Sequence, residues 1–121
     1  MGENIKDTET MTATFGRALP MRWISKQEFD RVRGFSFPNR ILSEKLHLLA
    51  QMARLNTLYS VKRAGSGHLG SSFSAMDIVS FLYYHYLNTA QLGPDHPDRD
   101  IYFSSKGHDV PGLYSVLYSL G

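Results

Sequence analysis

The sequence contains no cysteine among its 121 residues. This absence excludes disulfide bonds, thiolate metal sites and cysteine nucleophiles, and it fits a reducing compartment. The first residues lack the continuous apolar core of a secretory signal peptide. The most apolar run, residues 73–87, is shorter than a bilayer-spanning helix and contains Asp77 and His85. We therefore expect a cytoplasmic protein with no membrane partner.

Lysine and arginine do not gather into a basic run, and the 13 of them are nearly balanced by 11 aspartates and glutamates. A formal net charge of +2 is too small to indicate a nucleic-acid partner. Internal repeats and low-complexity tracts are also absent. A hydrophobic content of 42% is ordinary for a globular protein, and the length is enough for one small domain.

The chain divides into two regions. Residues 1–40 mix scattered aromatics with charges and show no clear period, so we interpret them as an N-terminal arm that covers another surface, with a short helix near residues 26–32. Residues 41–121 carry periodic apolar patterns that are typical of packed helices. We expect this second region to be part of a globular domain.

Two long helices are predicted in the second region. The first spans residues 40–62, and Gly65 is suited to end it. The second spans residues 75–88 and begins at a Ser-x-x-Asp capping box formed by Ser74 and Asp77. The apolar residues that we expect to face the core are Leu48, Met52, Leu55 and Tyr59 on the first helix and Ile78, Phe81, Leu82 and Tyr86 on the second.

Residues 101–104 form the single good strand candidate, because they are short and mostly apolar, as central parallel strands are. A third helix is predicted at residues 110–120, with Asp109 at its cap and Pro111 in its first turn. Helices around such a strand predict an α/β fold that is mostly helical in this chain. A lone central strand would leave its backbone groups unpaired, so we expect an incomplete part of a larger fold.

Two glycine–histidine motifs carry the strongest functional signal: Gly65-Ser66-Gly67-His68-Leu69-Gly70-Ser71-Ser72 and, further along the chain, Ser104-Ser105-Lys106-Gly107-His108. Each places one histidine beside glycines, where an imidazole can reach a bound ligand. Each also opens onto a helix start, where unpaired backbone N–H groups favour an anion. The glycines Gly65, Gly67 and Gly70 suit turns with positive φ and close ligand approach. We predict one shared site for a phosphorylated ligand.

From about residue 46 to residue 121 the sequence resembles the opening of the diphosphate-binding domain of transketolase, in particular the N-terminal section of split, two-subunit transketolases. Deoxyxylulose-phosphate synthase shares the Gly-His element, but the second motif favours transketolase. The resemblance covers about two thirds of this chain and a small part of a transketolase. The matching segments are Ser66 to Ser72, Asp77-Ile78, Asp98-Arg99-Asp100, Ser105 to His108, and Leu113-Tyr114.

The resemblance implies that residues 41–121 are a partial domain of a parallel-sheet fold that binds thiamine diphosphate. It implies catalytic roles for His68, in the substrate channel near the reactive carbon of the cofactor, and for His108, beside the diphosphate. Histidine suits such proton transfers because it titrates nearest to neutral pH. Lys106 either pairs with phosphate or is solvated. The cofactor-binding residues that the resemblance implies are His68, Gly70, Lys106, Gly107 and His108.

The chain departs from the family pattern at the metal site. The Gly-Asp-Gly element and the downstream asparagine that hold the cofactor's Mg²⁺ or Ca²⁺ in the family are absent, so we assign no metal ligand. The basic groups that bind the sugar phosphate are absent as well. In the family, the glutamate that activates the cofactor comes from another domain, usually of a partner subunit. The resemblance therefore implies a partner transketolase section or subunit in an oligomer.

The three remaining histidines are interpreted as having no catalytic or metal-binding role. We interpret His47, beside the apolar stripe of the first helix, as structural, His85 as packed and His96 as solvated. A zinc site built from His85, His96 and nearby aspartates lacks the spacing of known zinc motifs. The aromatic run at residues 81–86 is interpreted as core and subunit contact rather than a platform for nucleobases, because no basic groove accompanies it.

Two functions remain open. In the first, the chain is part of a transketolase of pentose phosphate metabolism, which transfers a two-carbon ketol unit between sugar phosphates once the remaining segments and a partner are present. In the second, it is a non-catalytic, truncated module that binds or modulates a full-length transketolase. The absent metal element favours the second for this chain alone, whereas the histidine motifs favour the first for its parent.

Overall fold

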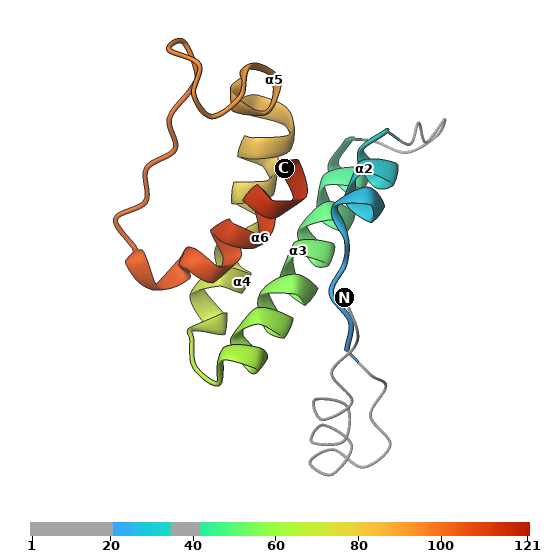
Figure 1. Ribbon diagram of the computed structural model, residues 1–121, viewed down its shortest axis with the longest axis vertical. Coiled ribbons are helices and arrows are strands. Elements are labelled where there is room, and N and C mark those ends of the chain that lie inside the picture. Colours follow the sequence, from blue (N-terminus) through green and yellow to red (C-terminus); the bar gives the residue numbers. More distant parts are fainter. Residues whose placement is uncertain (1–20, 35–41) are drawn as a thin grey trace.

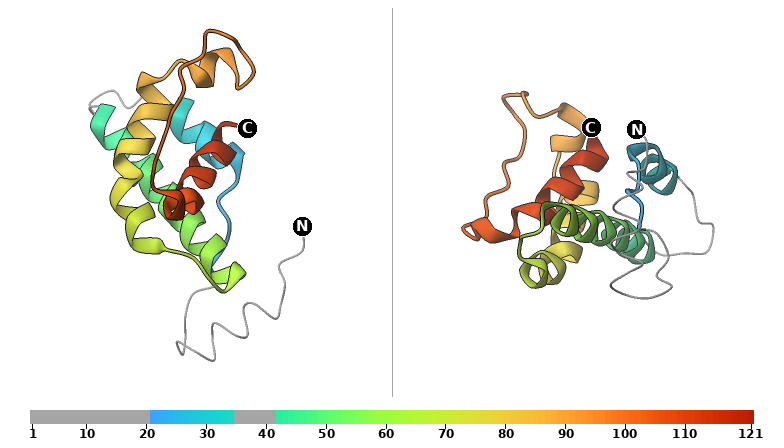
Figure 2. Two further views of the ribbon diagram at one scale, coloured as in Figure 1. Left: turned by 90° about the vertical axis from the view of Figure 1, so that its left-hand side faces the viewer. Right: turned by 60° about the horizontal axis from the view of Figure 1, so that its bottom comes forward.

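The computed structural model describes residues 21–34 and 42–121, and within these ranges the regular secondary structure is entirely helical. Helices α3, α4 and α6 pack against one another, and α2 packs on α3 and α6 (Figures 1 and 2). Most of the predicted arm lies outside the described residues. The elements are α2 (Lys26–Gly34), α3 (Leu42–Ala64), α4 (Leu69–Phe81), the π-helical turn η1 (Leu82–Tyr86), α5 (Thr89–Leu92), the 3-10 turn η2 (Gly107–Asp109) and α6 (Val110–Leu120).

The buried core is shared by α2, α3, α4, η1 and α6. On α3, Met52 is buried as predicted, but the prediction that Leu48 and Leu55 face the core is wrong, because they are 41% and 51% exposed. The buried face is rotated toward small alanines, which allow neighbouring helices to approach closely. The core side chains are Phe29, Leu49, Ala50, Met52, Ala53, Met76, Val79, Tyr83 and Val116.

Helix α4 begins at Leu69, six residues before the predicted start. The capping box predicted at Ser74 is wrong, because Ser74 lies inside the helix and its hydroxyl donates to the Ser71 carbonyl at 3.1 Å. The Asp77 carboxylate is used instead by Arg54 and His47 on α3. In this Ser-x-x-Asp pattern, Asp77 therefore joins α4 to α3 and does not cap a helix start.

The predicted burial of the second apolar face is also wrong for its largest members. Ile78 is 65% exposed, Tyr86 is 69% exposed and Phe81 is 42% exposed. Only Leu82 of the predicted set is half-buried. Nearly every position of this segment is apolar, so periodicity alone does not identify the side that faces the core.

The strand predicted at residues 101–104 is not formed, and no strand occurs in the described ranges. Tyr102 lies against the core, with its ring centroid 5.7 Å from that of Tyr83, whereas Ile101 and Phe103 are 77% and 84% exposed. The segment follows the loop after α5 as a stretched connection to η2 (Figure 1). The side chains alternate as in a strand, but a strand also needs a neighbouring backbone to bond with.

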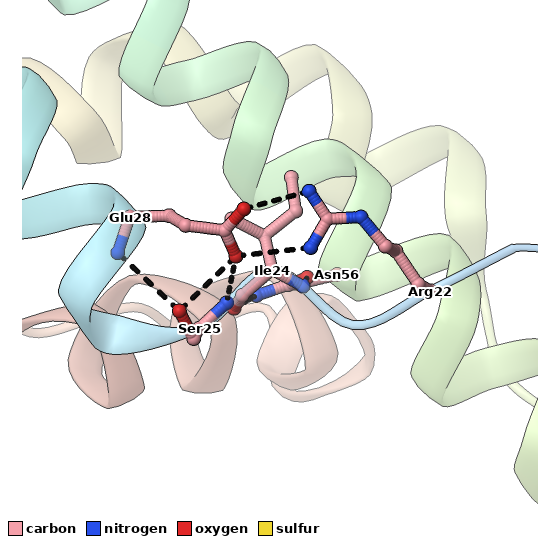
Figure 3. A network of polar contacts seen from close by, with 5 residues as sticks. All are labelled: Arg22, Ile24, Ser25, Glu28 and Asn56. Atoms are coloured by element: carbon pink, nitrogen blue, oxygen red, sulfur yellow. Dashed lines mark hydrogen bonds and ion pairs between the residues drawn. The ribbon is translucent and has the colours of Figure 1, made fainter. Parts of the chain in front are cut away.

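Residues 21–34, within the region interpreted as an arm, pack on α3 and α6. The Trp23 ring packs edge-on against Tyr59 and Tyr118, at centroid distances of 5.8 Å and 4.9 Å. The side chain of Asn56, fully buried on α3, accepts from the Ile24 N–H at 2.7 Å and donates to the Ile24 carbonyl at 2.9 Å (Figure 3). This pair of bonds fastens the N-terminal segment to α3.

A capping box that the sequence analysis did not identify starts α2. The Glu28 N–H donates to the Ser25 hydroxyl at 3.3 Å, and the Ser25 N–H donates to the Glu28 carboxylate at 2.9 Å (Figure 3). Arg22 adds an ion pair to the same carboxylate at 2.7 Å. The hydrogen bond from Arg22 and the bond from the Ser25 backbone hold the pKa of Glu28 at about 2, below its ordinary value of 4.5.

Candidate functional site

The first glycine–histidine motif forms the turn between α3 and α4. Gly65 ends α3 with φ at +74°, and its N–H donates to the Val61 carbonyl at 3.0 Å. Gly67 has φ at +140° and lies so close to Val61 that a Cβ would come within 2.9 Å of that side chain. His68 follows as the N-cap residue of α4. The two glycines therefore have the predicted positive φ, whereas Gly70 does not, because it lies inside the first turn of α4.

The second motif forms the turn before α6. Gly107, His108 and Asp109 make the 3-10 turn η2, which is closed by the Asp109 N–H donating to the Lys106 carbonyl at 3.3 Å. Helix α6 starts directly afterwards, as predicted, with Pro111 in its first turn. Asp109 occupies the predicted N-cap position, but its side chain makes no capping hydrogen bond.

The two turns are joined by a serine whose role the sequence analysis missed. Ser72, 2% exposed in the first turns of α4, donates its hydroxyl to the Asp109 carbonyl at 3.2 Å. Gly112 on α6 lies against the same serine, and a Cβ at that glycine would meet the Ser72 Cβ at 3.0 Å and the Met76 Cε at 3.2 Å. The close approach of α4 and α6 thus depends on two small residues. A serine one turn into a helix, facing a glycine in the first turn of another, carries no sequence signal of its own.

This packing brings His68 and His108 together. Their ring centroids are 5.2 Å apart, with the planes inclined at 65°, and both side chains are exposed. Two motifs far apart in sequence therefore meet at one surface. The remaining predicted site residues, Gly70, Lys106 and Gly107, are exposed on the same two turns.

The starts of α4 and α6 are both suited to an anion. Neither N-cap residue, His68 or Asp109, caps its helix with a side-chain hydrogen bond. The first N–H groups of a helix have no partner within the helix, and the helix dipole places partial positive charge there. The start of α4 beside a pair of imidazoles offers several hydrogen-bond donors to one phosphorylated ligand, whereas the start of α6 offers fewer because Pro111 has no N–H.

A small pocket lies between α4 and α6, next to this surface. None of the five predicted site residues lines it. Its lining is formed by Ser72, Ala75, Met76, Val79, Tyr102, Asp109, Gly112 and Leu113. Its apolar walls belong to the packing beneath the site and offer little to a charged ligand.

The other polar residues on α3 and α4 hold these helices together. The half-buried Arg54 guanidinium donates to the Phe73 carbonyl at 2.8 and 3.1 Å and pairs with Asp77. His47, whose side chain is 61% exposed, completes this cluster with a 3.0 Å contact to Asp77, which is a structural role as predicted. The hydrogen bond from Arg54, followed by that from His47, holds the pKa of Asp77 below its ordinary value.

The remaining two histidines differ from expectation in detail. His85, predicted to be packed in the helix, is exposed, although its ring lies 5.5 Å from that of Phe81. His96 is half-buried in its loop, and its Nδ1 accepts from the Asp98 N–H at 3.1 Å. The described residues contain no group of three or more histidines and carboxylates placed to hold a metal ion. No helix in the described ranges is long and apolar enough to cross a membrane.

Comparison with known proteins identifies what the two motifs belong to. Residues 46–121, more than half of the chain, match the family described as "Transketolase, thiamine diphosphate binding domain". The chain is 40% identical to transketolase-like protein 2 of Bos taurus over 73 residues, and this matched region is 60% of this chain and 12% of that protein. It is 32% identical over 90 residues to transketolase of Mus musculus, which covers 74% of this chain and 14% of that protein.

A shorter relative also matches. The 6-deoxy-6-sulfo-D-fructose transketolase subunit of Clostridium sp. (strain MSTE9) is 35% identical over 68 residues, which is 56% of this chain and 25% of that protein. No solved structure matches the chain. The chain therefore spans about one eighth to one quarter of the length of these relatives.

Proposed function

Since this chain belongs to the transketolase family, within the thiamine diphosphate binding domain, we propose that it supplies part of the cofactor and substrate site of a transketolase. The parent enzyme would transfer a two-carbon ketol unit between sugar phosphates, in cytoplasmic carbohydrate metabolism of the pentose phosphate type. The observation that carries the proposal is the meeting of His68 and His108, 5.2 Å apart, at two helix starts without side-chain caps.

The two histidines would carry the proton transfers. Moving a ketol unit requires protons to be given to and taken from hydroxyl and carbonyl oxygens, and an exposed imidazole does both near neutral pH. His68, at the start of α4, would face the sugar, while His108 would lie by the diphosphate. When bound, thiamine diphosphate supplies the carbon that carries the ketol unit.

The surrounding turns would hold the diphosphate. The backbone N–H groups near Gly70 and Gly107 lie at the two helix starts, and Lys106 adds a positive charge that can reach an anion. The diphosphate also needs Mg²⁺ or Ca²⁺, which prefers clustered oxygen ligands. The described residues contain no such cluster, so we propose that the ion is held by segments outside them.

The exposed apolar residues support a partner. Ile101 and Phe103, at 77% and 84% exposure, and Ile78, at 65%, offer surface that the rest of a diphosphate-binding domain or a second subunit would cover. We propose that the active form is an oligomer containing the remaining transketolase sections. The second candidate, a non-catalytic module that binds or modulates a full-length transketolase, is favoured by the lack of a metal-ligand group among the described residues.

A chimera tests the catalytic proposal. Residues 46–121 replace the matched segment of Mus musculus transketolase, and ketol transfer is measured with single alanine variants. We expect His68→Ala and His108→Ala each to lower turnover by about 10²–10⁴-fold, the usual effect of losing a positioned acid–base group. His85 is an exposed histidine in η1 and is not one of the site residues, so His85→Ala serves as the matched control and should leave turnover unchanged. Full turnover in both site variants would overturn the assignment.

Calorimetry separates the two candidate functions. The 121-residue chain alone should bind thiamine diphosphate weakly even with Mg²⁺, because the ion's ligands are not among its described residues. The chain mixed with a full-length transketolase should change that enzyme's turnover if it is a modulating module. Tight, Mg²⁺-dependent cofactor binding to the chain alone would contradict the account of an incomplete site.

A further inference from the structure

The His68–His108 pair has a property that proton transfer does not use. Both imidazoles are exposed, and within residues 21–34 and 42–121 neither ring makes a hydrogen bond. Each of the other three histidines makes a polar or ring contact outside the pair: His47 with Asp77, His85 with Phe81, and His96 with Asp98. The ring nitrogens of His68 and His108 are therefore open to an external ligand.

The spacing of the two rings matches a shared metal ion. A Zn–N bond of about 2.0–2.1 Å places the ion about 3.2 Å from the centroid of each ligating imidazole. Two imidazoles at a tetrahedral angle on one ion then have centroids about 5 Å apart. The observed separation is 5.2 Å. Exposed side chains change rotamer on a fast timescale, so both rings can turn a nitrogen toward the ion.

The backbone under the pair is held in place on both sides. Gly67 is packed against Val61 below His68, and the Ser72 hydroxyl bonds the Asp109 carbonyl next to His108. The two turns are therefore fixed relative to each other before any ligand arrives. Because the two backbone turns are already aligned, chelation orders only the two side chains and costs less entropy than bringing together two independent segments would.

We propose that His68 and His108 form a two-imidazole site for a divalent transition-metal cation such as Zn²⁺, with water completing the coordination. Imidazole suits zinc, copper and nickel, whereas Mg²⁺ prefers oxygen ligands, so the site discriminates against the ion that accompanies thiamine diphosphate. The consequence of this binding for activity rests on the proposed function. A bound Zn²⁺ occupies the ring nitrogens that would transfer protons, so the metal inhibits the completed enzyme.

Zinc binding is measured directly on the tag-free 121-residue chain, by calorimetry and by the imidazole C–H signals in NMR. We expect one Zn²⁺ per chain, with the signals of His68 and His108 shifting together. His68→Ala and His108→Ala should each weaken binding by at least about 10–100-fold, because even the loss of a supporting residue around a metal has that effect. His85→Ala should bind as the unchanged chain does, and circular dichroism confirms that each variant keeps its helix content.

Three outcomes would overturn the metal site: unchanged affinity in both site variants, an equal loss in His85→Ala, or Mg²⁺ competing with Zn²⁺ at equal concentration. The readout is binding, so it is independent of ketol transfer. If the chimera needs both histidines but the chain does not bind Zn²⁺, the metal site is wrong and the proposed function stands. If the chain binds Zn²⁺ through the pair but the chimera does not need the histidines, the proposed function is wrong and the metal site stands.

Discussion

Replacing Gly112 with alanine is expected to disturb the contact that aligns the two helix starts. A Cβ at this position would lie 3.0 Å from the Ser72 Cβ and 3.2 Å from the Met76 Cε, whereas carbon atoms pack best at about 3.5–4.0 Å. Ser72 and Met76 are 2% and 1% exposed, and the Ser72 Cβ is fixed to the backbone of α4, so it cannot turn aside as the end of a long side chain can. Helix α6 must therefore shift away from α4, which also weakens the hydrogen bond from Ser72 to Asp109.

The size of the effect follows from a matched glycine. Gly70 lies in the first turn of α4, has no positive φ, and has nothing within 4 Å of a built Cβ. Both substitutions gain helix propensity, by up to about 1 kcal/mol each, because alanine favours the helix over glycine. Only Gly112→Ala also overpacks the interior, at a cost of about 1–3 kcal/mol. The free energy of unfolding should therefore be about 1–3 kcal/mol lower for Gly112→Ala than for Gly70→Ala.

Urea unfolding followed by circular dichroism measures this difference at one pH and temperature. The slope of the free energy against urea should be the same for both variants, since both expose the same surface on unfolding. A Gly112→Ala chain as stable as the Gly70→Ala chain would refute the claim that close packing at Ser72 sets the spacing of α4 and α6.

Two further predictions concern the N-terminal segment. Asn56→Ala should lower the free energy of unfolding by about 2–4 kcal/mol, because it leaves both backbone groups of Ile24 without partners. The control variant Asn88→Ala loses two comparable hydrogen bonds at the surface and should lower the free energy of unfolding by less than about 1 kcal/mol. Equal losses for the two variants in urea titrations would contradict this account. The pKa of Glu28 is about 2 in the folded chain, below its ordinary 4.5, so the stability that its carboxylate contributes is complete above about pH 4.5 and is lost as the pH falls toward 2. The free energy of unfolding of the unchanged chain should therefore exceed that of Glu28→Gln by less at about pH 3 than at about pH 6. A difference that does not change with pH would show that the ionised Glu28 network does not stabilise the fold.

The two glycine–histidine motifs predicted two turns that open onto helices, and both turns are formed. Glycine–histidine segments that open helices constrain the backbone locally, and the structure places both histidines at helix starts. The contacts that align the turns were not predictable. Ser72 and Gly112 are 40 residues apart, and nothing in either local pattern indicates that they touch.

The helices show the same limit. The Ser-x-x-acid pattern occurs at Ser25 and at Ser74, and only the first caps a helix, because Asp77 is drawn to Arg54 and His47 across the helix pair. The pattern is local, but the choice between the two sites is made by tertiary contacts. The long helices α3 and α6 were predicted because their periodic apolar residues extend over several turns.

The missing strand has a related cause. Residues 101–104 have the composition and alternation of a strand, with Tyr102 against the core and Phe103 exposed. Strand formation depends on hydrogen bonds to a second backbone, and no segment of the described residues pairs with this one. The composition of residues 101–104 therefore indicates that they are able to form a strand, but a strand forms only where a second backbone is present to pair with them.

The central claim is that His68 and His108 act together on one ligand in the completed enzyme. The measurement that tests it most directly is a double-mutant cycle of ketol transfer in the chimera, with His68→Ala, His108→Ala and the double variant. Because the rings are 5.2 Å apart, we expect the double variant to lose little more turnover than the more damaged single variant, so the coupling is close to the smaller single loss, about 2.7 kcal/mol or more for a 10²-fold effect. Losses that simply multiply would show that the two histidines act independently and would contradict the shared site.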